Sequence, residues 1–432
     1  MIPIVLADGT AEQQLLSSLR QRSTEVDKKV TESVSQILER VRNEGDAAVR
    51  DYTLKFDGKL PESFEVSRDE INDALSEADP DFVEALLNAQ ANIVEFHNRQ
   101  KHQSFIDAKP NGVILGQRIR GLHRVGLYVP GGTAAYPSSV LMNAIPAKIA
   151  GVEEIIMVTP PLKNGKANPD ILVAASICGV DRVFLMGGAQ AVAALAYGTE
   201  TVPQVDKIVG PGNIFVATAK KLLYGTVDID MIAGPSEILV LADDSADAKY
   251  VAADLMSQAE HDRLASAILI TTSERLAKET AVELERQMAY LSRKEIIEES
   301  LTNFGGIIIC DNMDKAIDLA NQVAPEHLEV AVDNPFLYLG RLDNAGSIFL
   351  GHYAPEPLGD YYAGPNHVLP TSGTARFFSP LSVDAFVKKS SYIYYTREAL
   401  EEAHEDIILL AKKEGLTAHA NSIEVRFPES RS

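Results

Sequence analysis

The chain has 432 residues, 46% of them hydrophobic, which is enough to bury two or three cores and predicts a multidomain soluble enzyme. A net charge of -21 repels the phosphates of nucleic acids and of anionic lipids, so neither kind of partner is expected. The opening segment has no basic leader before an apolar stretch, and no later run approaches the ~18 apolar residues of a membrane span. We therefore expect a cytoplasmic protein. The two cysteines, Cys178 and Cys310, lie in apolar runs without paired spacing, which predicts buried reduced thiols.

The predicted elements are helices in the first part of the chain and alternating strands and helices after it. Residues 11 to about 103 carry long amphipathic patterns of helical period, which predict a helical region. After a strand-like segment, short apolar runs alternate with helical segments, and the runs begin near residues 126, 154, 182 and 206. A second alternation of the same kind extends from 237–245 to 328–332. This spacing is typical of βαβ units, so both alternations predict parallel sheets.

The last part of the chain is less regular. Segment 350–380 is rich in Gly, Pro, Tyr and Ser and shows no clear period, which predicts an ordered loop region with a functional role. A strand is then predicted over 386–396 and a charged helix from about 396 to 414, with Gly415 as its C-terminal stop. An irregular end containing His419 follows.

Four polar residues are candidate metal ligands. Gln258 and His261 stand near the end of the helical segment 245–262, where their spacing puts an amide and an imidazole on one face. Asp360 lies in the Gly- and Pro-rich segment, and His419 lies in the tail. Each has an ordinary interpretation as well: an exposed polar pair on a helix, a turn-capping aspartate and a solvent-facing histidine.

Glu326 and His327 follow a predicted helix that ends at Pro325. Neighbouring side chains of a regular strand point to opposite faces, so both can serve one site only where the backbone turns. A histidine, with an ordinary pKa of ~6.5, can accept a proton at neutral pH, and a carboxylate beside it can polarise water. A purely structural Glu and His at a helix end is the alternative. Glu414 is a weaker candidate. A helix C-terminus disfavours negative charge by ~0.3 to 1 kcal/mol, and a functional role of the carboxylate would explain an acidic residue at this position.

Three glycine-containing turns follow predicted strands, at 128–132, 186–190 and 209–213, and each opens a predicted helix. Glycine lets a ligand approach the backbone, and helix N-termini favour phosphate. However, no GxGxxG follows the first strand of the alternation, and the next strand does not end in the acidic residue that usually binds a ribose. The turns therefore indicate a ligand without identifying it.

Three motifs carry a resemblance to a known family. SQAEH (257–261), APEHLE (324–329) and GPNHVLPT (364–371) resemble the corresponding segments of the histidinol dehydrogenases, and the resemblance spans roughly residues 120 to 420. It implies one zinc ion per subunit, for which Mn²⁺ or Co²⁺ are possible substitutes given mixed oxygen and nitrogen donors. The implied ligands are Gln258, His261, Asp360 and His419.

The resemblance also implies roles for the other candidates. His327 becomes the general base, and Glu326 becomes the residue that activates water. The implied substrate contacts are Ser236, Gln258, His261, His327, Asp360, Glu414 and His419. The implied NAD contacts, one in each glycine-containing turn, are Tyr128, Gln190 and Asn213.

The implied reaction is the NAD-dependent, four-electron oxidation of L-histidinol to L-histidine through bound L-histidinal, the last step of histidine biosynthesis. Members of this family are homodimers in which the tail reaches the neighbouring active site, which leaves His419 and Glu414 to act either in cis or in trans. Two alternatives stay open. A metal-dependent amide hydrolase could use the same Glu-His pair, and a catalytically silent α/β binding protein would share the fold.

Pattern and resemblance together predict an α/β protein with two Rossmann-like parallel-sheet domains, a helical N-terminal region and a small C-terminal tail domain. Residues 1–25 form an N-terminal arm in this prediction. The first α/β domain is discontinuous, carries the metal and catalytic residues, and comprises 26–125 and 236–380. Residues 126–235 form the second, NAD-binding domain, and 381–432 form the tail domain that contacts the partner subunit.

Overall fold

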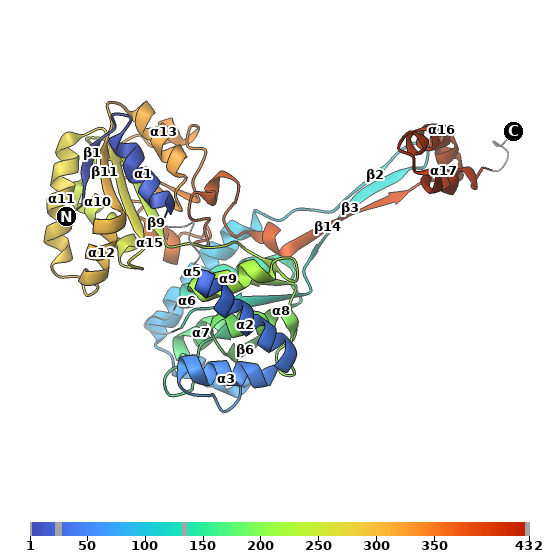
Figure 1. The fold of residues 1–432 in the computed structure, drawn as a ribbon, viewed down its shortest axis with the longest axis horizontal. Helices are drawn as coiled ribbons and strands as arrows, with labels where there is room; N and C mark the ends of the chain where they lie inside the picture. The colour runs from blue at the N-terminus through green and yellow to red at the C-terminus, as the bar shows by residue number, and fades with distance from the viewer. Residues whose placement is uncertain (1, 22–27, 132–135, 428–432) are drawn as a thin grey trace. The chain divides into compact units, whose positions relative to one another are not determined.

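The structure is a computed structural model that describes residues 2–21, 28–131 and 136–427. The chain divides into two compact units (Figure 1). The first comprises Met1–Lys101 and Leu122–Phe386, and the second comprises His102–Gly121 and Val387–Ser432. The first unit contains two parallel sheets, each covered by helices, so the predicted fold class is confirmed.

One parallel sheet has five strands in the order β6-β5-β4-β7-β8. Its strands are β4 (Arg124–Tyr128), β5 (Glu154–Thr159), β6 (Arg182–Leu185), β7 (Lys207–Val209) and β8 (Asp228–Ile229). The first four begin close to the predicted positions. The helices that connect them are α6 (Pro137–Ala150), α7 (Pro169–Cys178), α8 (Gly188–Tyr197) and α9 (Ile214–Leu223). Because helices cover both faces, the strands are nearly continuous apolar runs.

The other parallel sheet has six strands in the order β1-β11-β10-β9-β12-β13. These are β1 (Ile4–Leu6), β9 (Glu237–Ala242), β10 (Ser266–Thr271), β11 (Gly305–Ile309), β12 (His327–Ala331) and β13 (Ser347–Leu350). The helices of this layer are α1 (Ala11–Gln21), α10 (Ala248–Ala259), α11 (Glu274–Met288), α12 (Lys294–Phe304), α13 (Met313–Val323), α14 (Phe336–Leu339) and α15 (Glu356–Tyr361). The N-terminal segment thus supplies an edge strand to a sheet built mainly from residues 237–350.

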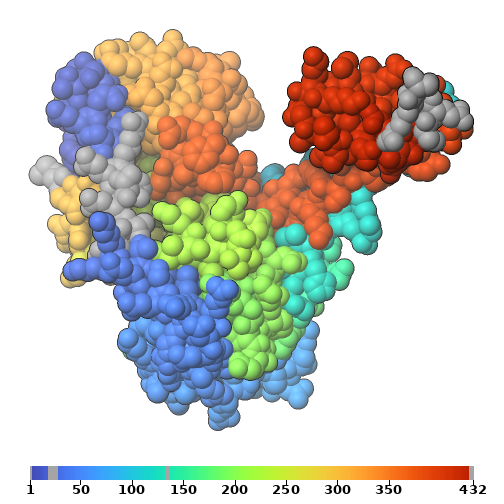
Figure 2. All heavy atoms as spheres, turned by 45° about the vertical axis from the view of Figure 1, so that its right-hand side comes forward, coloured from blue at the N-terminus to red at the C-terminus, as the bar shows by residue number. Residues whose placement is uncertain are grey.

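The predicted N-terminal helical region consists of α2 (Lys28–Glu44), α3 (Asp46–Asp57), α4 (Arg68–Glu77) and α5 (Pro80–Asn98). These helices pack on the five-stranded sheet: α2 contacts α8 and α9, α4 contacts α7, and α5 contacts α6. In Figure 2 the blue N-terminal helices lie beside the green surface of this layer. The domain division predicted from the sequence instead placed these helices, within residues 26–125, in one domain with residues 236–380. An amphipathic pattern shows that a helix face is buried but does not show which partner covers it.

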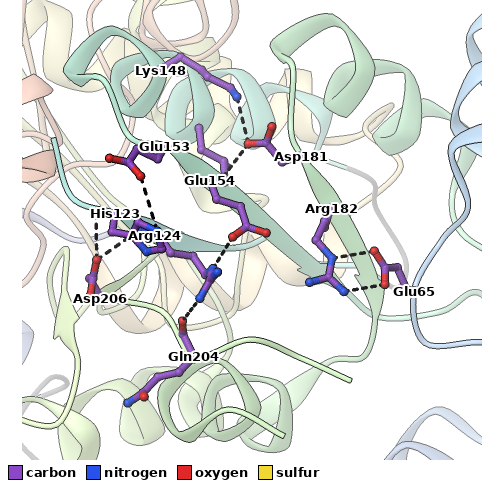
Figure 3. A network of polar contacts seen from close by, with 11 residues as sticks. Glu65, His123, Arg124, Lys148, Glu153, Glu154, Asp181, Arg182, Gln204 and Asp206 are labelled. Atoms are coloured by element: carbon purple, nitrogen blue, oxygen red, sulfur yellow. Dashed lines mark hydrogen bonds and ion pairs between the residues drawn. The ribbon is translucent and has the colours of Figure 1, made fainter. Parts of the chain in front are cut away.

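The connection between α3 and α4 explains this attachment. Residues 64–66 run along β6, where the amide of Leu185 donates to Phe64 and the amide of Val66 donates to Val183. The guanidinium of Arg182 also donates two hydrogen bonds of 2.7 Å to the carboxylate of Glu65 (Figure 3). The edge of the sheet therefore finds its backbone partners in the N-terminal region, which leaves it less available for pairing with another chain.

The second unit is built on an antiparallel sheet of order β14-β3-β2. Its strands are β2 (Phe105–Ala108), β3 (Ile114–Gly121) and β14 (Val387–Tyr394), and its helices are α16 (Arg397–Lys413) and α17 (Thr417–Glu424). The predicted strand and charged helix of the tail are present, and Gly415 stands beyond the helix with a left-handed φ of 76°. The end expected to be irregular is the helix α17, which contains His419.

Two further expectations concern burial. Both cysteines are buried, and burial raises the pKa of Cys178 to about 12 and that of Cys310 to about 11, so the thiols stay protonated. No helix in the described part of the chain is long and apolar enough to cross a membrane.

A buried ion pair fixes the turn between β7 and α9. Lys220 of α9 pairs with Asp230, and both side chains are at least 97% buried, with exposed fractions of 3% and 1%. Lys220 also donates to the carbonyl of Gly210, and Asp230 accepts the amide of Gly210 at 2.8 Å. Gly210 has a φ of 111°, and a Cβ there would overlap the carbonyl oxygen of Tyr128.

Replacing Lys220 should therefore destabilise the fold. We expect Lys220→Met to lower the free energy of unfolding by ~3 to 5 kcal/mol, because it leaves a carboxylate buried without its counter-charge. Lys221→Met, at the exposed neighbouring position of the same helix, should change it by no more than ~0.5 kcal/mol. Urea denaturation followed by circular dichroism measures both values. Equal effects at the two positions would show that the pair contributes nothing.

Candidate active site

Opposite edges of the two parallel sheets meet at one cavity of about 300 Å³. The five-stranded sheet contributes loops at its carboxyl edge, where β4 and β7 end, through Pro130, Gly210 and Asn213. The six-stranded sheet contributes its amino edge, where β9 and β12 begin. Lining residues from that layer are Ser236, Gln258, His261, Glu326, His327 and Asp360. The structure thus brings seven of the predicted site residues together, these six and Asn213.

The Glu-His pair is held by one peptide group, that of Glu237 at the start of β9. Glu326 lies in the turn before β12, and one of its carboxylate oxygens accepts the amide hydrogen of Glu237 at 2.9 Å. His327 is the first residue of β12, and its Nδ1 lies 2.8 Å from the Glu237 carbonyl oxygen. The backbone turns between the two residues, as their joint use of one site requires.

This arrangement fixes the tautomer of His327. A carbonyl oxygen can only accept a hydrogen bond, so Nδ1 carries the proton and Nε2 keeps its lone pair. Nε2 is buried and has no hydrogen-bond partner among the described residues. Burial lowers the pKa of His327 to about 4, although the nearby carboxylate of Asp360 opposes the shift. At neutral pH the ring is therefore an uncharged base whose Nε2 keeps a free lone pair.

Glu326 lies in a different electrostatic setting. Its side chain is buried, and burial raises its pKa well above the ordinary value, while the hydrogen bond from the Glu237 amide opposes this. The charges of Asp360 and Glu356 raise it further. The carboxyl group is thus poised to exchange a proton within the cavity, as a group that handles water must.

Gln258 and His261 do not lie on one helix face, although the sequence predicted that they would. Helix α10 runs back from the carboxyl edge of its sheet and ends at Ala259, so Gln258 is in the last turn. His261 lies beyond the helix, in a turn closed by a hydrogen bond of its amide to the Gln258 carbonyl. The prediction of a shared helix face is wrong, because the chain leaves the helix before His261. Both residues still line the cavity.

Asp360 also differs in its setting. It was expected in a loop, but it belongs to the short helix α15. Burial tends to raise its pKa, yet the ring of His367, with its Nδ1 3.6 Å from the carboxylate, and the nearby ring of His327 outweigh this and lower the pKa below its ordinary value. Asp360 is therefore a buried carboxylate that stays ionised.

Glu356, one turn before Asp360 on α15, is a member of the site that sequence analysis missed. Its side chain is buried, its Oε1 lies 3.7 Å from the Nε2 of His327, and its Oε2 accepts a hydrogen bond of 3.3 Å from Ser257. Burial raises its pKa, as does the charge of Asp360. The prolines that flank Glu356 predict a helix start, and from there a spacing of four residues would have placed it beside Asp360.

The side chains around Asp360 fit a divalent cation. His327, Glu356 and Asp360 offer ligand atoms that lie within 4.8 Å of one another. Gln258 is buried and lines the same cavity, so its amide oxygen is a further candidate donor. Amide oxygen, carboxylate oxygen and imidazole nitrogen are all donors that zinc accepts. Of the four predicted ligands, Asp360 thus belongs to this cluster, and Gln258 and His261 line the same cavity.

The remaining predicted substrate and metal residues belong to the second unit. Glu414 follows the last residue of α16, and His419 lies in α17 with its side chain exposed. The lining of the catalytic cavity consists of residues from the first unit, Ser236 among them.

The predicted NAD contacts line a second cavity, of about 970 Å³, at the carboxyl edge of the five-stranded sheet. The hydroxyl of Tyr128 accepts the amide hydrogen of Gly188 at 3.0 Å, and burial raises its pKa to about 12. Gln190 is 1% exposed, and its side-chain oxygen has no partner within the described segments. Asn213 caps the N-terminus of α9. This cavity and the catalytic one share Pro130 and Asn213.

Comparison with known proteins identifies the family. The family model for histidinol dehydrogenase matches residues 20–427. The chain is 58% identical over 424 residues to a histidinol dehydrogenase of Clostridium acetobutylicum, and 56% identical over 421 residues to one of Listeria innocua, covering 98% of each chain in both cases. The chain belongs to the histidinol dehydrogenase family.

The fold agrees with this membership. The crystal structure of histidinol dehydrogenase from Elizabethkingia anophelis matches with a TM-score of 0.93 at 38% identity, over 100% of this chain and 99% of that one. The predicted function, histidinol oxidation in the final step of histidine biosynthesis, is confirmed at the level of the family. The amide hydrolase is not favoured. Zinc, NAD and the second subunit remain predictions.

The electrostatics of His327 can be tested directly. In metal-free protein we expect its ring to stay neutral from pH 7 down to about pH 5, because burial lowers its pKa to about 4. Two-dimensional NMR of the histidine ring carbons reports the protonation state, and a His327→Asn variant assigns the signal. A midpoint near the unperturbed value of ~6.5 would contradict the burial argument.

Proposed function

We propose that the chain oxidises L-histidinol to L-histidine through bound L-histidinal, in two NAD-dependent steps. The observation that carries this proposal is the neutral ring of His327, which has an unpartnered Nε2 and lines the same cavity as Gln258, His261 and Asp360. A base without a proton is what the first step needs, because an alcohol must lose its hydroxyl proton as hydride departs.

Zinc is the metal that this donor set suits, and its proposed ligands are Gln258, His261, Asp360 and His419. When bound, zinc would hold the imidazole and amino nitrogens of the substrate and so fix its orientation. The amide of Gln258, buried in the cavity lining, and the ionised carboxylate of Asp360 support the site. Manganese or cobalt would also accept these donors.

His327 acts in both oxidations. Its Nε2 accepts the hydroxyl proton of the alcohol in the first step and a hydroxyl proton of the aldehyde hydrate in the second. The hydrogen bond from Nδ1 to the Glu237 carbonyl keeps the ring in this orientation and stabilises the charge it gains. The buried thiols take no part, since Cys178 and Cys310 remain protonated.

Glu326 supports the addition of water between these two steps. Its carboxyl group lies beside His327, with 3.7 Å between its Oε2 and the ring Nδ1, and is anchored by the Glu237 amide. From this position it can take a proton from the water that adds to the aldehyde carbon. Its raised pKa favours that proton transfer over a permanently charged state.

NAD is the dinucleotide proposed for the second cavity, where it would accept the hydride in each oxidation. The buried side-chain oxygen of Gln190 is an unsatisfied acceptor there, and the turn at Gly188 brings backbone close to a ligand. Tyr128 and Asn213 complete the proposed contacts. The Pro130 and Asn213 boundary shared by the two cavities is the place where the two reactants would meet.

We also propose a cytoplasmic homodimer with shared active sites. Ser236, in the cavity lining, would contact the substrate together with Glu414 and His419. The last two residues stand on the helices of the second unit, and a two-fold dimer allows each subunit to supply them to its partner.

The proposed reaction makes a stoichiometric prediction. Purified protein should form two NADH per L-histidinol, measured by NADH absorbance, and the product should be L-histidine by mass spectrometry. We expect His327→Asn to lower kcat by about 10² to 10⁴, because the base is lost. His123→Asn, at an exposed position outside the cavity, is the matched control and should leave kcat unchanged.

Removal of the metal extends this test. A strong chelator should abolish turnover, and added zinc should restore it, because substrate orientation depends on the ion. Turnover of one NADH per histidinol would contradict the two-step reaction. Full activity after verified metal removal would contradict the zinc site.

Shared sites predict complementation between inactive subunits. A heterodimer of one His419→Asn chain and one His327→Asn chain should regain half of the wild-type activity, because one of its two sites then contains both histidines. Differently tagged subunits allow purification of the heterodimer, and both variant homodimers serve as inactive controls. Sites formed within one chain would give a heterodimer as inactive as either homodimer.

A further inference from the structure

The second cavity contains an acidic residue that none of the proposed NAD contacts accounts for. Asp57 lines it together with Tyr128 and Gln190, although Asp57 lies outside the repeating βαβ pattern. It is the last residue of α3, a helix of the N-terminal region. No acidic residue stands at the end of β5, the position from which dinucleotide-binding folds usually hold a ribose.

The setting of Asp57 is unfavourable for a carboxylate without a ligand. A helix C-terminus disfavours negative charge, and Gly58 ends α3 immediately afterwards in the left-handed conformation. One oxygen of Asp57, Oδ2, is buried without a hydrogen-bond partner among the residues that the structure describes. Burial raises the pKa of Asp57 to about 6, so most of the population is still charged at neutral pH.

The position of Asp57 indicates which part of a dinucleotide it would meet. The catalytic cavity adjoins this one at Pro130 and Asn213, so the reacting nicotinamide belongs at that boundary. Asp57 lines the second cavity but not the catalytic one, and it stands next to Phe56 and near Pro160, which follows β5. Because the nicotinamide belongs at the boundary with the catalytic cavity, the adenosine half of the dinucleotide would lie at the Asp57 end of the second cavity.

The chemistry of a carboxylate indicates which groups of the dinucleotide Asp57 would bind. An ionised carboxylate accepts hydrogen bonds and repels phosphate, so it suits a pair of ribose hydroxyls and opposes a phosphate ester on either of them. Lys163, exposed at the same cavity, would otherwise attract such a phosphate. Any preference for a dinucleotide with a free ribose therefore depends on Asp57.

We infer that Asp57 binds the adenosine ribose hydroxyls of the dinucleotide and selects NAD against NADP. The inference rests on the proposed NAD-dependent function. It assigns to α3 the role that the end of the second strand has in standard dinucleotide folds.

Direct binding tests this assignment without turnover. Isothermal titration calorimetry should show that Asp57→Asn raises the Kd for NAD by about ten- to a hundredfold, since a charge-assisted hydrogen bond is lost. The ratio of the Kd for NADP to that for NAD should fall by at least the same factor. Asp51→Asn, an exposed position of the same helix that does not line the cavity, is the matched control and should leave both values unchanged.

A second measurement uses the wild-type chain, so it does not depend on the variant folding. NAD that lacks the adenosine 2′-hydroxyl should bind wild-type protein about tenfold more weakly than NAD. In a folded Asp57→Asn protein this difference should disappear. In turnover, the variant should show a raised KM for NAD with kcat and the KM for histidinol unchanged.

The outcomes separate the two proposals. If wild-type protein oxidises histidinol with NAD, but neither Asp57→Asn nor loss of the 2′-hydroxyl changes binding by more than twofold, the role of Asp57 is wrong and the proposed function stands. If wild-type protein binds no dinucleotide, the proposed function fails and this inference fails with it.

Discussion

The proposed catalytic chemistry of this chain depends on the peptide group of one residue, Glu237. Its carbonyl accepts from Nδ1 of His327 and its amide donates to Glu326, so the first residue of β9 orients the side chains of both proposed catalytic residues. Parallel pairing of β12 with β9 puts His327 opposite Ile238 and thereby brings the two side chains within reach of that peptide. The register of two buried strands thus determines which ring nitrogen keeps its lone pair.

The position of the site follows from the way the two sheets face each other. Open α/β sheets bind ligands at the carboxyl edge beside the strand where the order reverses, and in the five-stranded sheet this point lies where β4 and β7 are side by side. The six-stranded sheet contributes its opposite edge, because α10 returns the chain to the start of β9 before Gln258 and His261 appear. In the proposed function, one sheet therefore supplies the turns that would bind the dinucleotide, while the other supplies the proposed base and the proposed metal ligands.

Much of this could be predicted from the sequence, and the omissions have physical causes. The period of apolar residues located the strands from β4 to β7, because parallel strands are buried on both faces. Period alone could not show that α2 to α5 cover the five-stranded sheet, since an amphipathic face does not identify its partner. Glu356 and Asp57 were missed for a related reason: a carboxyl group owes its role to burial and neighbours, which tertiary packing creates.

The strand β1 has a consequence for how the chain is assembled. Residues 4–6 pair with residues 307–309, so β1 can cover the edge of β11 only after some three hundred intervening residues have been synthesised. The five-stranded sheet draws its strands from one continuous stretch and can form earlier on the ribosome. A chain clipped behind its first helix would leave β11 as a bare apolar edge, open to strand-by-strand aggregation.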